Sequence, residues 1–178
     1  MERQGRLHLY IGSGKGKTTA AAGLTIRALG HDMKVLFAQF LKNLETGENI
    51  ILEGFTDKLC FFRPVQHHTK FLWNMTEQEL AQTKEDIRRG WEHLRQQMQT
   101  GLWDLIVLDE ILDCIQCQLL EEEDILKTIK ERPEKVEVVC TGRNASQAFY
   151  NIADYISVIN AVKHPYDEGI KARRGIEY

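Results

Sequence analysis

The feature that most constrains this chain is a segment rich in glycine and lysine between a short apolar run and a helical pattern. The apolar run Leu7–Ile11 precedes it, Lys17–Leu29 follows as a predicted helix, and Gly30 is placed to end that helix. The segment consists of Gly12, Ser13, Gly14, Lys15, Gly16, Lys17, Thr18 and Thr19. Glycines allow backbone N–H groups to turn inward around phosphate oxygens, with help from the helix N-terminus. Strand, turn and helix together predict a phosphate-binding P-loop.

The spacing within this P-loop is unusual. The common pattern places four residues between its first glycine and Gly-Lys-Thr. Here only three residues separate Gly12 from Gly16, and Ile11 stands where the first glycine is expected. We expect Lys17 to contact phosphate oxygens as a point charge and Thr18 to offer its hydroxyl to Mg²⁺. A glycine-rich turn with unrelated lysines is the alternative, and the spacing leaves the direction of nucleotide binding open.

Short apolar runs alternate with helical patterns along the rest of the chain. Further strands are predicted at Val35–Phe40, Leu59–Phe62, Leu105–Leu108, Val136–Cys140 and Tyr155–Ile159. Further helices are predicted from a capping box at Thr76 to Gly101, at Glu121–Arg132 and at Ser146–Ile152. Apolar strands that alternate with helices indicate a mostly parallel sheet flanked by helices on both faces. We therefore expect one α/β domain over residues 1–178, with a P-loop NTPase (RecA-like) fold.

The longest predicted helix carries an apolar stripe. Its capping box joins Thr76 to Glu79, and its apolar residues then recur at intervals of 7, 4, 3 and 4. These intervals are helical spacings that place the side chains on one face of a helix. The residues on that face are Leu80, Ile87, Trp91, Leu94 and Met98.

Polar side chains follow two more of the predicted strands. Asp109 and Glu110 come directly after Leu105–Leu108, and Thr141-Gly142-Arg143 follows Val136–Cys140. The carboxyl ends of parallel strands share one sheet edge, where ligands bind, so these residues are expected beside the P-loop. The two acids are predicted to hold Mg²⁺, the alternative being ordinary acids at a helix start. Arg143 is predicted either to contact phosphate or to be a structural surface arginine.

Composition excludes several classes of protein. The net charge of −3 disfavours a nucleic-acid binder that neutralises phosphates. No apolar run approaches the ~20 residues of a membrane span, and the polar start shows no signal peptide, so a cytoplasmic enzyme without a membrane partner is expected. The four cysteines are then expected to be reduced, and Cys114 and Cys117 alone are too few for a structural zinc site.

A second possible ligand segment contains aromatic residues. Phe71 and Trp73 lie in a stretch without clear periodicity before the capping box. Such aromatics suit a flat, partly apolar ligand when they are exposed, and otherwise pack into the core. The residues alone leave both readings open.

The sequence resembles the P-loop corrinoid adenosyltransferases over almost its whole length. The similarity is carried by the P-loop with its short spacing, by Gln39–Lys42 and by Leu108–Ile111. The most specific match is the tail, which comprises Lys163–Tyr166, Gly169–Arg173 and Gly175–Tyr178. The resemblance implies transfer of the 5′-deoxyadenosyl group of ATP to Co(I) of a reduced corrinoid, with release of triphosphate. It also implies that ATP is held in the reverse sense, with C5′ facing the nucleophile.

The resemblance also implies roles for particular residues. Lys17 and Glu110 are expected to act in catalysis, with Thr18, Glu110 and Asp109 around Mg²⁺. Arg27 and Arg143 are expected to contact the nucleotide. In a loop on the corrinoid side, Phe71 and Trp73 are expected to displace the lower axial ligand of cobalt, although Leu72 and Lys70 replace the usual Thr and Gly there.

Partners follow from the same resemblance. The corrinoid substrate is cobalamin, cobinamide or cobyrinic acid a,c-diamide, and cobalt enters only as part of it. An electron-donating flavoprotein reductase and a homodimer are expected. Because only about five residues precede the first strand, cover for the site is expected from loops, the tail or a second subunit. The alternatives are a P-loop kinase or ATPase acting at the γ-phosphate, and a nucleotide switch or DNA binder.

Overall fold

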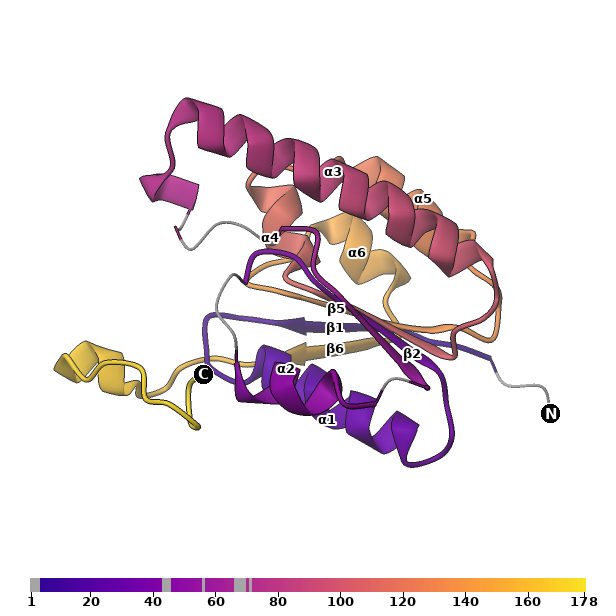
Figure 1. Ribbon diagram of the computed structural model, residues 1–178, viewed down its shortest axis with the longest axis horizontal. Helices are drawn as coiled ribbons and strands as arrows, with labels where there is room; N and C mark the ends of the chain where they lie inside the picture. The colour runs from indigo at the N-terminus through magenta and orange to yellow at the C-terminus, as the bar shows by residue number, and fades with distance from the viewer. Residues whose placement is uncertain (1–3, 43–45, 56, 66–69, 71) are drawn as a thin grey trace.

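A computed structural model describes residues 4–42, 46–55, 57–65, 70 and 72–178. Within these residues, six parallel strands form one sheet in the order β3-β2-β4-β5-β1-β6 (Figure 1). The strands are β1 (Leu7–Ile11), β2 (Val35–Gln39), β3 (Leu59–Phe62), β4 (Leu105–Asp109), β5 (Glu137–Gly142) and β6 (Tyr155–Val158). The predicted α/β fold with a parallel sheet is confirmed.

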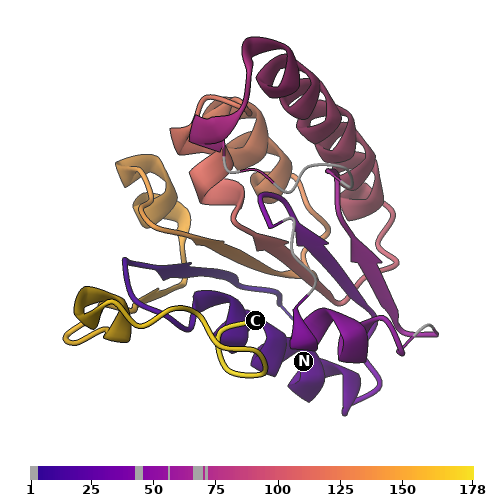
Figure 2. The ribbon, with the colours of Figure 1, turned by 60° about the vertical axis from the view of Figure 1, so that its left-hand side comes forward.

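Helices cover both faces of the sheet, as Figures 1 and 2 show. The α-helices are α1 (Lys17–Leu29), α2 (Gly47–Leu52), α3 (Glu77–Gln99), α4 (Ile111–Gln116), α5 (Glu122–Lys130) and α6 (Gln147–Ile152). On one face, Ala21 of α1 and Leu52 of α2 join a buried cluster with Phe37 and Val107 of the sheet. On the other face, α3 to α6 enclose a larger cluster around Leu9. Since both faces are covered, β2 and β4 are buried throughout, and their sequences are apolar up to the last residue of each strand.

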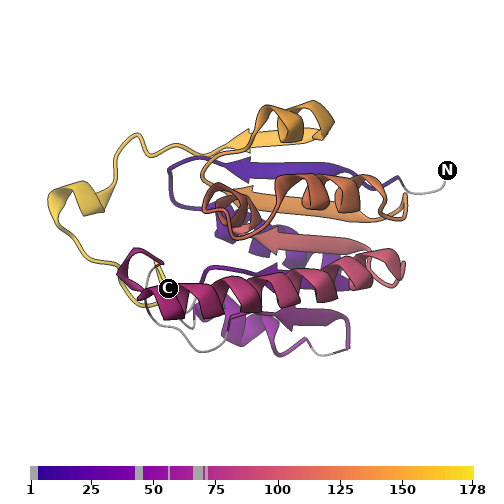
Figure 3. The same ribbon diagram turned by 90° about the horizontal axis from the view of Figure 1, so that it is seen from above.

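The strand order decides which loops meet. The P-loop strand β1 and the acid-bearing strand β4 are not neighbours, because β5 lies between them. Gln39 is paired with Asp109 across β2 and β4, and Tyr10 with Thr141 across β1 and β5. The segments that follow β1, β2, β4 and β5 therefore emerge at one edge of the sheet (Figure 3). Among the described residues, no helix is both long and apolar enough to cross a membrane.

Helix α3 is buried over only part of the apolar face that its spacing defines. The Thr76 capping box is present, and Ile87, Trp91 and Leu94 are buried. Leu80, which the spacing places on the same helical face, is 39% exposed. The reason is that the first turns of α3 extend past the edge of the sheet, as Figure 1 shows, where no strand lies beneath them.

Helix α2 and the short helix of the tail are among the elements that were not predicted. Helix α2 lies between β2 and β3, where its six residues are too few to reveal a period. The C-terminal tail contains the short 3-10 helix η2 (Pro165–Glu168) and then turns back toward the P-loop (Figures 1 and 3). All four cysteines are free, as expected.

Burial along α3 gives a stability prediction. Leu94→Ala should lower the free energy of unfolding by about 2–5 kcal/mol, because it removes methyl groups from a fully buried site and leaves a cavity. Leu80→Ala, the same change on the same helix, should cost less than about 1 kcal/mol, since its side chain is already partly in water. Urea unfolding measures both. Equal losses would contradict the placement of α3.

Candidate active site

The P-loop is held open by close backbone contacts from its sides. Gly12 N donates to Arg143 O at 3.0 Å, and Gly14 N donates to Ile159 O at 2.8 Å. A Cβ at Gly12 would lie 2.3 Å from Ile159 O, so a side chain cannot be accommodated there. Gly12 and Gly16 also have φ angles of 119° and 120°, which favour glycine. The segments after β5 and β6 therefore fix the shape of the loop.

Lys17 closes across this loop. Its Nζ donates to Gly12 O at 2.7 Å and to Gly14 O at 3.0 Å. Burial lowers the pKa of Lys17, Asp113 opposes that shift, and the nearby charge of Arg143 lowers the pKa further. The ammonium thus lies at the centre of the loop, bound to carbonyl oxygens that an incoming phosphate group can replace.

A buried carboxylate lies beside the loop. Asp109, at the end of β4, is fully buried. Its Oδ1 accepts hydrogen bonds from Thr141 Oγ1 at 2.7 Å and from Thr18 Oγ1 at 3.0 Å. Its Oδ2 accepts from Gln39 Nε2 at 3.0 Å. The structure thus brings together Thr18 and Asp109, which are 91 residues apart in sequence.

Glu110 follows in a left-handed conformation, with φ at 64°. This is uncommon for a residue other than glycine and turns the chain from β4 into α4. Its backbone N–H donates to Thr141 Oγ1 at 2.9 Å. Burial, and then the negative charge of Asp109, raise the pKa of Glu110 from 4.5 to about 7, although Lys42 opposes the shift. Its carboxyl group lines the pocket beside Thr18.

Sequence reasoning missed Lys42 as a site residue. Lys42 lies just after β2, and its Nζ donates to Thr18 Oγ1 and lies 3.4 Å from Asp109 Oδ2. It also forms an ion pair with Glu110 at 4.0 Å. The signal was available, because Gln39 ends a buried strand and Lys42 follows it closely, just as Asp109 and Thr141 stand at the ends of β4 and β5.

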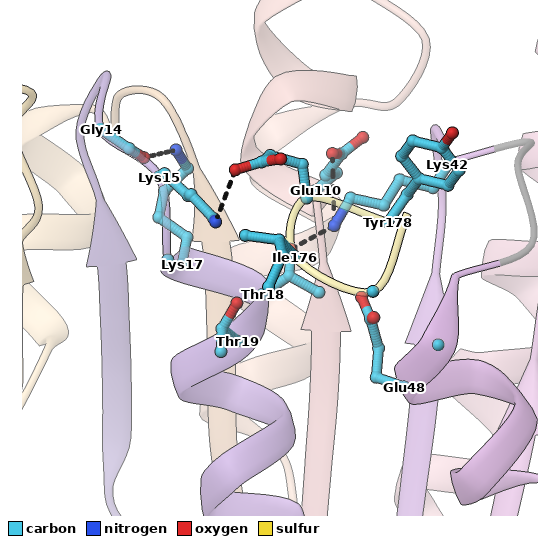
Figure 4. Close-up of a pocket in the computed structure, with 14 residues that line it drawn as sticks. Gly14, Lys15, Lys17, Thr18, Thr19, Lys42, Glu48, Glu110, Ile176 and Tyr178 are labelled. Carbon is cyan, nitrogen blue, oxygen red and sulfur yellow. Dashed lines mark hydrogen bonds and ion pairs between the residues drawn. The ribbon is translucent and has the colours of Figure 1, made fainter. Parts of the chain in front are cut away.

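These groups surround a pocket of about 430 Å³ (Figure 4). The tail forms one wall, where Glu177 pairs with Lys15 at 3.1 Å and is held by Arg173. The pocket is lined by Gly14, Lys15, Gly16, Lys17, Thr18, Thr19, Lys42, Gly47, Glu48, Glu110, Gly175, Ile176, Glu177 and Tyr178. The tail is one of the three sources of cover expected from the sequence. Its individual contacts were not predicted, because they are ion pairs between residues far apart in the chain.

Arg27, Arg143 and Trp73, which were also predicted as site residues, do not line the pocket. Arg27 is exposed on α1 and outside the lining, ten residues beyond Lys17, which is ~15 Å along a helix. Arg143 contributes its backbone to Gly12, and its side chain is exposed. Trp73, in the 3-10 helix η1 (Leu72–Asn74), is 73% exposed and outside the lining. Phe71 lies outside the described residues. Their ligand contacts stay predictions.

The donor set suits a hard cation. Thr18 Oγ1 and the carboxylates of Asp109 and Glu110 are oxygens of the kind that Mg²⁺ prefers, and the Lys42 ammonium already lies among them. The described residues contain no group of three or more His, Cys, Asp or Glu side chains that could hold a metal. A site with so few carboxylates fits an ion that shares its coordination with nucleotide phosphates and water.

Comparison with known proteins identifies the family. The chain is 32% identical to the corrinoid adenosyltransferase of Escherichia coli (strain K12), over 99% of this chain and 87% of that protein. It is 33% identical to the corrinoid adenosyltransferase CobA of Salmonella typhimurium (strain LT2), with the same coverage. It is 33% identical to the corrinoid adenosyltransferase of Pseudomonas aeruginosa (strain PAO1), over 99% and 85% of the two chains.

The family model described as ATP:corrinoid adenosyltransferase BtuR/CobO/CobP matches residues 3–178. The match includes the P-loop, the acid pair after β4 and the tail that lines the pocket. The chain is therefore an enzyme that belongs to the ATP:corrinoid adenosyltransferase family.

Proposed function

We propose that this enzyme transfers the 5′-deoxyadenosyl group of ATP to Co(I) of a reduced corrinoid and releases triphosphate. The observation that carries the proposal is the pocket itself, in which Lys15, Lys17 and Lys42 converge on one P-loop in a member of this family. Three ammonium groups within one pocket suit a polyphosphate of high negative charge.

The proposed reaction requires little acid–base chemistry from the protein. The lone pair of Co(I) attacks C5′ of ATP, the C5′–O bond breaks, and triphosphate leaves with the bonding electrons while cobalt becomes Co(III). No proton moves, so the chain's task is to position the two substrates and to stabilise the charge that grows on the leaving group. Lys17 and the P-loop N–H groups are placed for the second task.

A bound Mg²⁺ would neutralise charge on the leaving triphosphate. Thr18, Asp109 and Glu110 are the residues that we propose to hold it. Thr18 and Glu110 line the pocket, and Asp109 lies directly behind Thr18, to which it is hydrogen bonded. The proposed metal role of these residues rests on the chemistry of their oxygens and on their shared contacts with Lys42, which are ion pairs for Asp109 and Glu110 and a hydrogen bond for Thr18.

The corrinoid is proposed to approach from the side of η1. Figure 1 shows this segment beyond the same sheet edge as the P-loop, next to the start of α3. ATP would then lie with C5′ toward η1, where Trp73 is exposed to a flat ligand. A flavoprotein reductase is proposed as the electron donor and a homodimer as the assembly.

The raised pKa of Glu110 favours one alternative to the proposed function, a kinase or an ATPase. With a pKa of about 7 the Glu110 carboxyl group suits a general base, which a kinase or ATPase acting at the γ-phosphate would need. The products distinguish the two reactions, because such an enzyme leaves ADP and the adenosyltransferase leaves triphosphate.

The decisive assay uses the purified protein with ATP, Mg²⁺ and a chemically reduced corrinoid. We expect the absorption spectrum of the adenosylated corrinoid and one triphosphate for each corrinoid converted. Lys17→Ala should lower kcat/KM at least about a hundredfold, because the charge on the leaving group loses its closest cation. Release of orthophosphate with an unchanged corrinoid spectrum would refute the proposed reaction.

Trp73 gives a second prediction. If it displaces the lower axial ligand and so makes Co(II) easier to reduce, Trp73→Ala should slow turnover more with a reductase and Co(II) than with preformed Co(I). Leu102→Ala is the control, since Leu102 is also exposed but precedes β4 at the opposite edge of the sheet. Equal losses for Trp73→Ala in both assays would count against the displacement.

Glu110 gives a prediction on pH. Its pKa is raised in the folded protein, so the folded state retains a proton that the unfolded chain releases between pH 4.5 and about 7. The metal-free protein therefore loses stability as pH rises through this window. Glu110→Gln should raise the free energy of unfolding by about 1–3 kcal/mol at pH 8 and by less at pH 5.

Thermal unfolding in EDTA measures this effect. Glu123→Gln is the matched control, because Glu123 is an exposed glutamate on α5 away from the pocket, and it should show no such pH-dependent gain. A constant gain for Glu110→Gln at both pH values would contradict the retained proton.

A further inference from the structure

Lys42 places a positive charge where the metal ligands meet. It reaches the pocket from the end of β2, opposite the P-loop, and Figure 4 shows it directed toward Thr18 and Glu110. Its Nζ donates to Thr18 Oγ1, lies 3.4 Å from Asp109 Oδ2 and pairs with Glu110 at 4.0 Å. The three proposed Mg²⁺ ligands therefore share one protein cation.

The hydroxyl group of Thr18 can contact either the Lys42 ammonium or a metal ion, but not both. It donates its proton to Asp109 at 3.0 Å and accepts a hydrogen bond from Lys42. A metal ion bound to Thr18 would use a lone pair of the same oxygen that accepts the hydrogen bond from the ammonium. Both cations would also need the carboxylate oxygens of Asp109 and Glu110 that Lys42 contacts. Two positive charges at this spacing repel strongly, so only one of them fits.

The burial of the Asp109 and Glu110 carboxyl groups explains why a cation is needed beside them when no nucleotide is bound. Asp109 is fully buried, and the side chain of Glu110 is only 25% exposed. Two neighbouring carboxyl groups with little water around them are costly to ionise together. The side chain of Lys42 is 27% exposed and flexible, which allows it to stabilise them and still move within the pocket.

We propose that Lys42 is a positioning residue that occupies the Mg²⁺ site in the nucleotide-free enzyme and transfers to triphosphate oxygens when Mg²⁺ and ATP bind. The first half of the proposal, that Lys42 occupies the Mg²⁺ site, concerns only the metal and the protein. The second half rests on the proposed function, since it assigns Lys42 to the leaving triphosphate. In the enzyme with Mg²⁺ and ATP bound, the Lys42 ammonium would replace its contacts to Thr18 and Asp109 with contacts to phosphate oxygens.

The first test measures Mn²⁺ binding without nucleotide by electron paramagnetic resonance, with Mn²⁺ as a probe that accepts the same oxygen ligands. Lys42→Met should bind Mn²⁺ about tenfold more tightly than the unaltered enzyme, because the competing ammonium is gone. Lys15→Met is the matched control. It removes a lysine that lines the same pocket and pairs with Glu177, and it should change Mn²⁺ affinity less than about threefold.

Two outcomes would overturn the first half. Unchanged or weaker Mn²⁺ binding by Lys42→Met would show that the ammonium does not compete with the metal. An equal gain in Lys15→Met would show a general effect of pocket charge. The double variant Lys42→Met with Glu110→Gln should lose the gain. Lys42→Gln keeps a polar side chain and replaces Lys42→Met if the latter does not fold.

The second test measures binding of inorganic triphosphate with Mg²⁺ by calorimetry. Lys42→Met should bind it about tenfold more weakly, the opposite sign to its effect on Mn²⁺ alone, while Lys42→Arg should retain most of the affinity. Tighter Mn²⁺ binding combined with unchanged triphosphate binding would overturn the second half. Neither measurement requires a corrinoid, so failure of the adenosyl transfer assay would be distinguishable from failure here.

Discussion

The buried carboxylate of Asp109 is the interaction on which the site depends. It accepts hydrogen bonds from Thr18 on α1, Gln39 on β2 and Thr141 on β5, and it lies at the end of β4. An isolated buried charge of this kind would cost several kcal/mol. Its partners offset that cost only when three strands and the first helix hold their register. The same carboxylate therefore links the folding of the sheet to the position of the P-loop.

This dependence explains why the chemistry gathers at one edge. Parallel pairing sets Gln39 directly opposite Asp109 across β2 and β4. The insertion of β5 between β1 and β4 brings the Thr141 hydroxyl between the P-loop side and the acid side. The oxygen of Thr141 donates to Asp109 and accepts from the Glu110 N–H, so it also fixes the left-handed turn that directs Glu110 into the pocket.

The sequence predicted those parts of the site that local patterns encode. The P-loop and the acid pair stand next to strands whose apolar runs are plain, and β1 and β3 have the predicted bounds. Lys42 was missed because its neighbours are decided by strand order, which periodicity does not report. The exposure of Leu80 could not be predicted for a related reason, since helical spacing defines a face and not the extent of the sheet beneath it. The tail has no period and is placed by Lys15 and Arg173 around Glu177.

The nucleotide-free pocket has a further regularity, in that each of its lysines is bound to a protein oxygen. Lys17 holds the carbonyls of Gly12 and Gly14, Lys15 holds Glu177, and Lys42 holds Thr18. Binding of a polyphosphate must exchange each of these contacts, so its affinity is the difference between new and broken hydrogen bonds. The exchange favours a ligand with several oxygens at once, because a single phosphate group can replace only part of the set. We therefore expect the proposed nucleotide site to favour a longer polyphosphate chain as well as a higher charge.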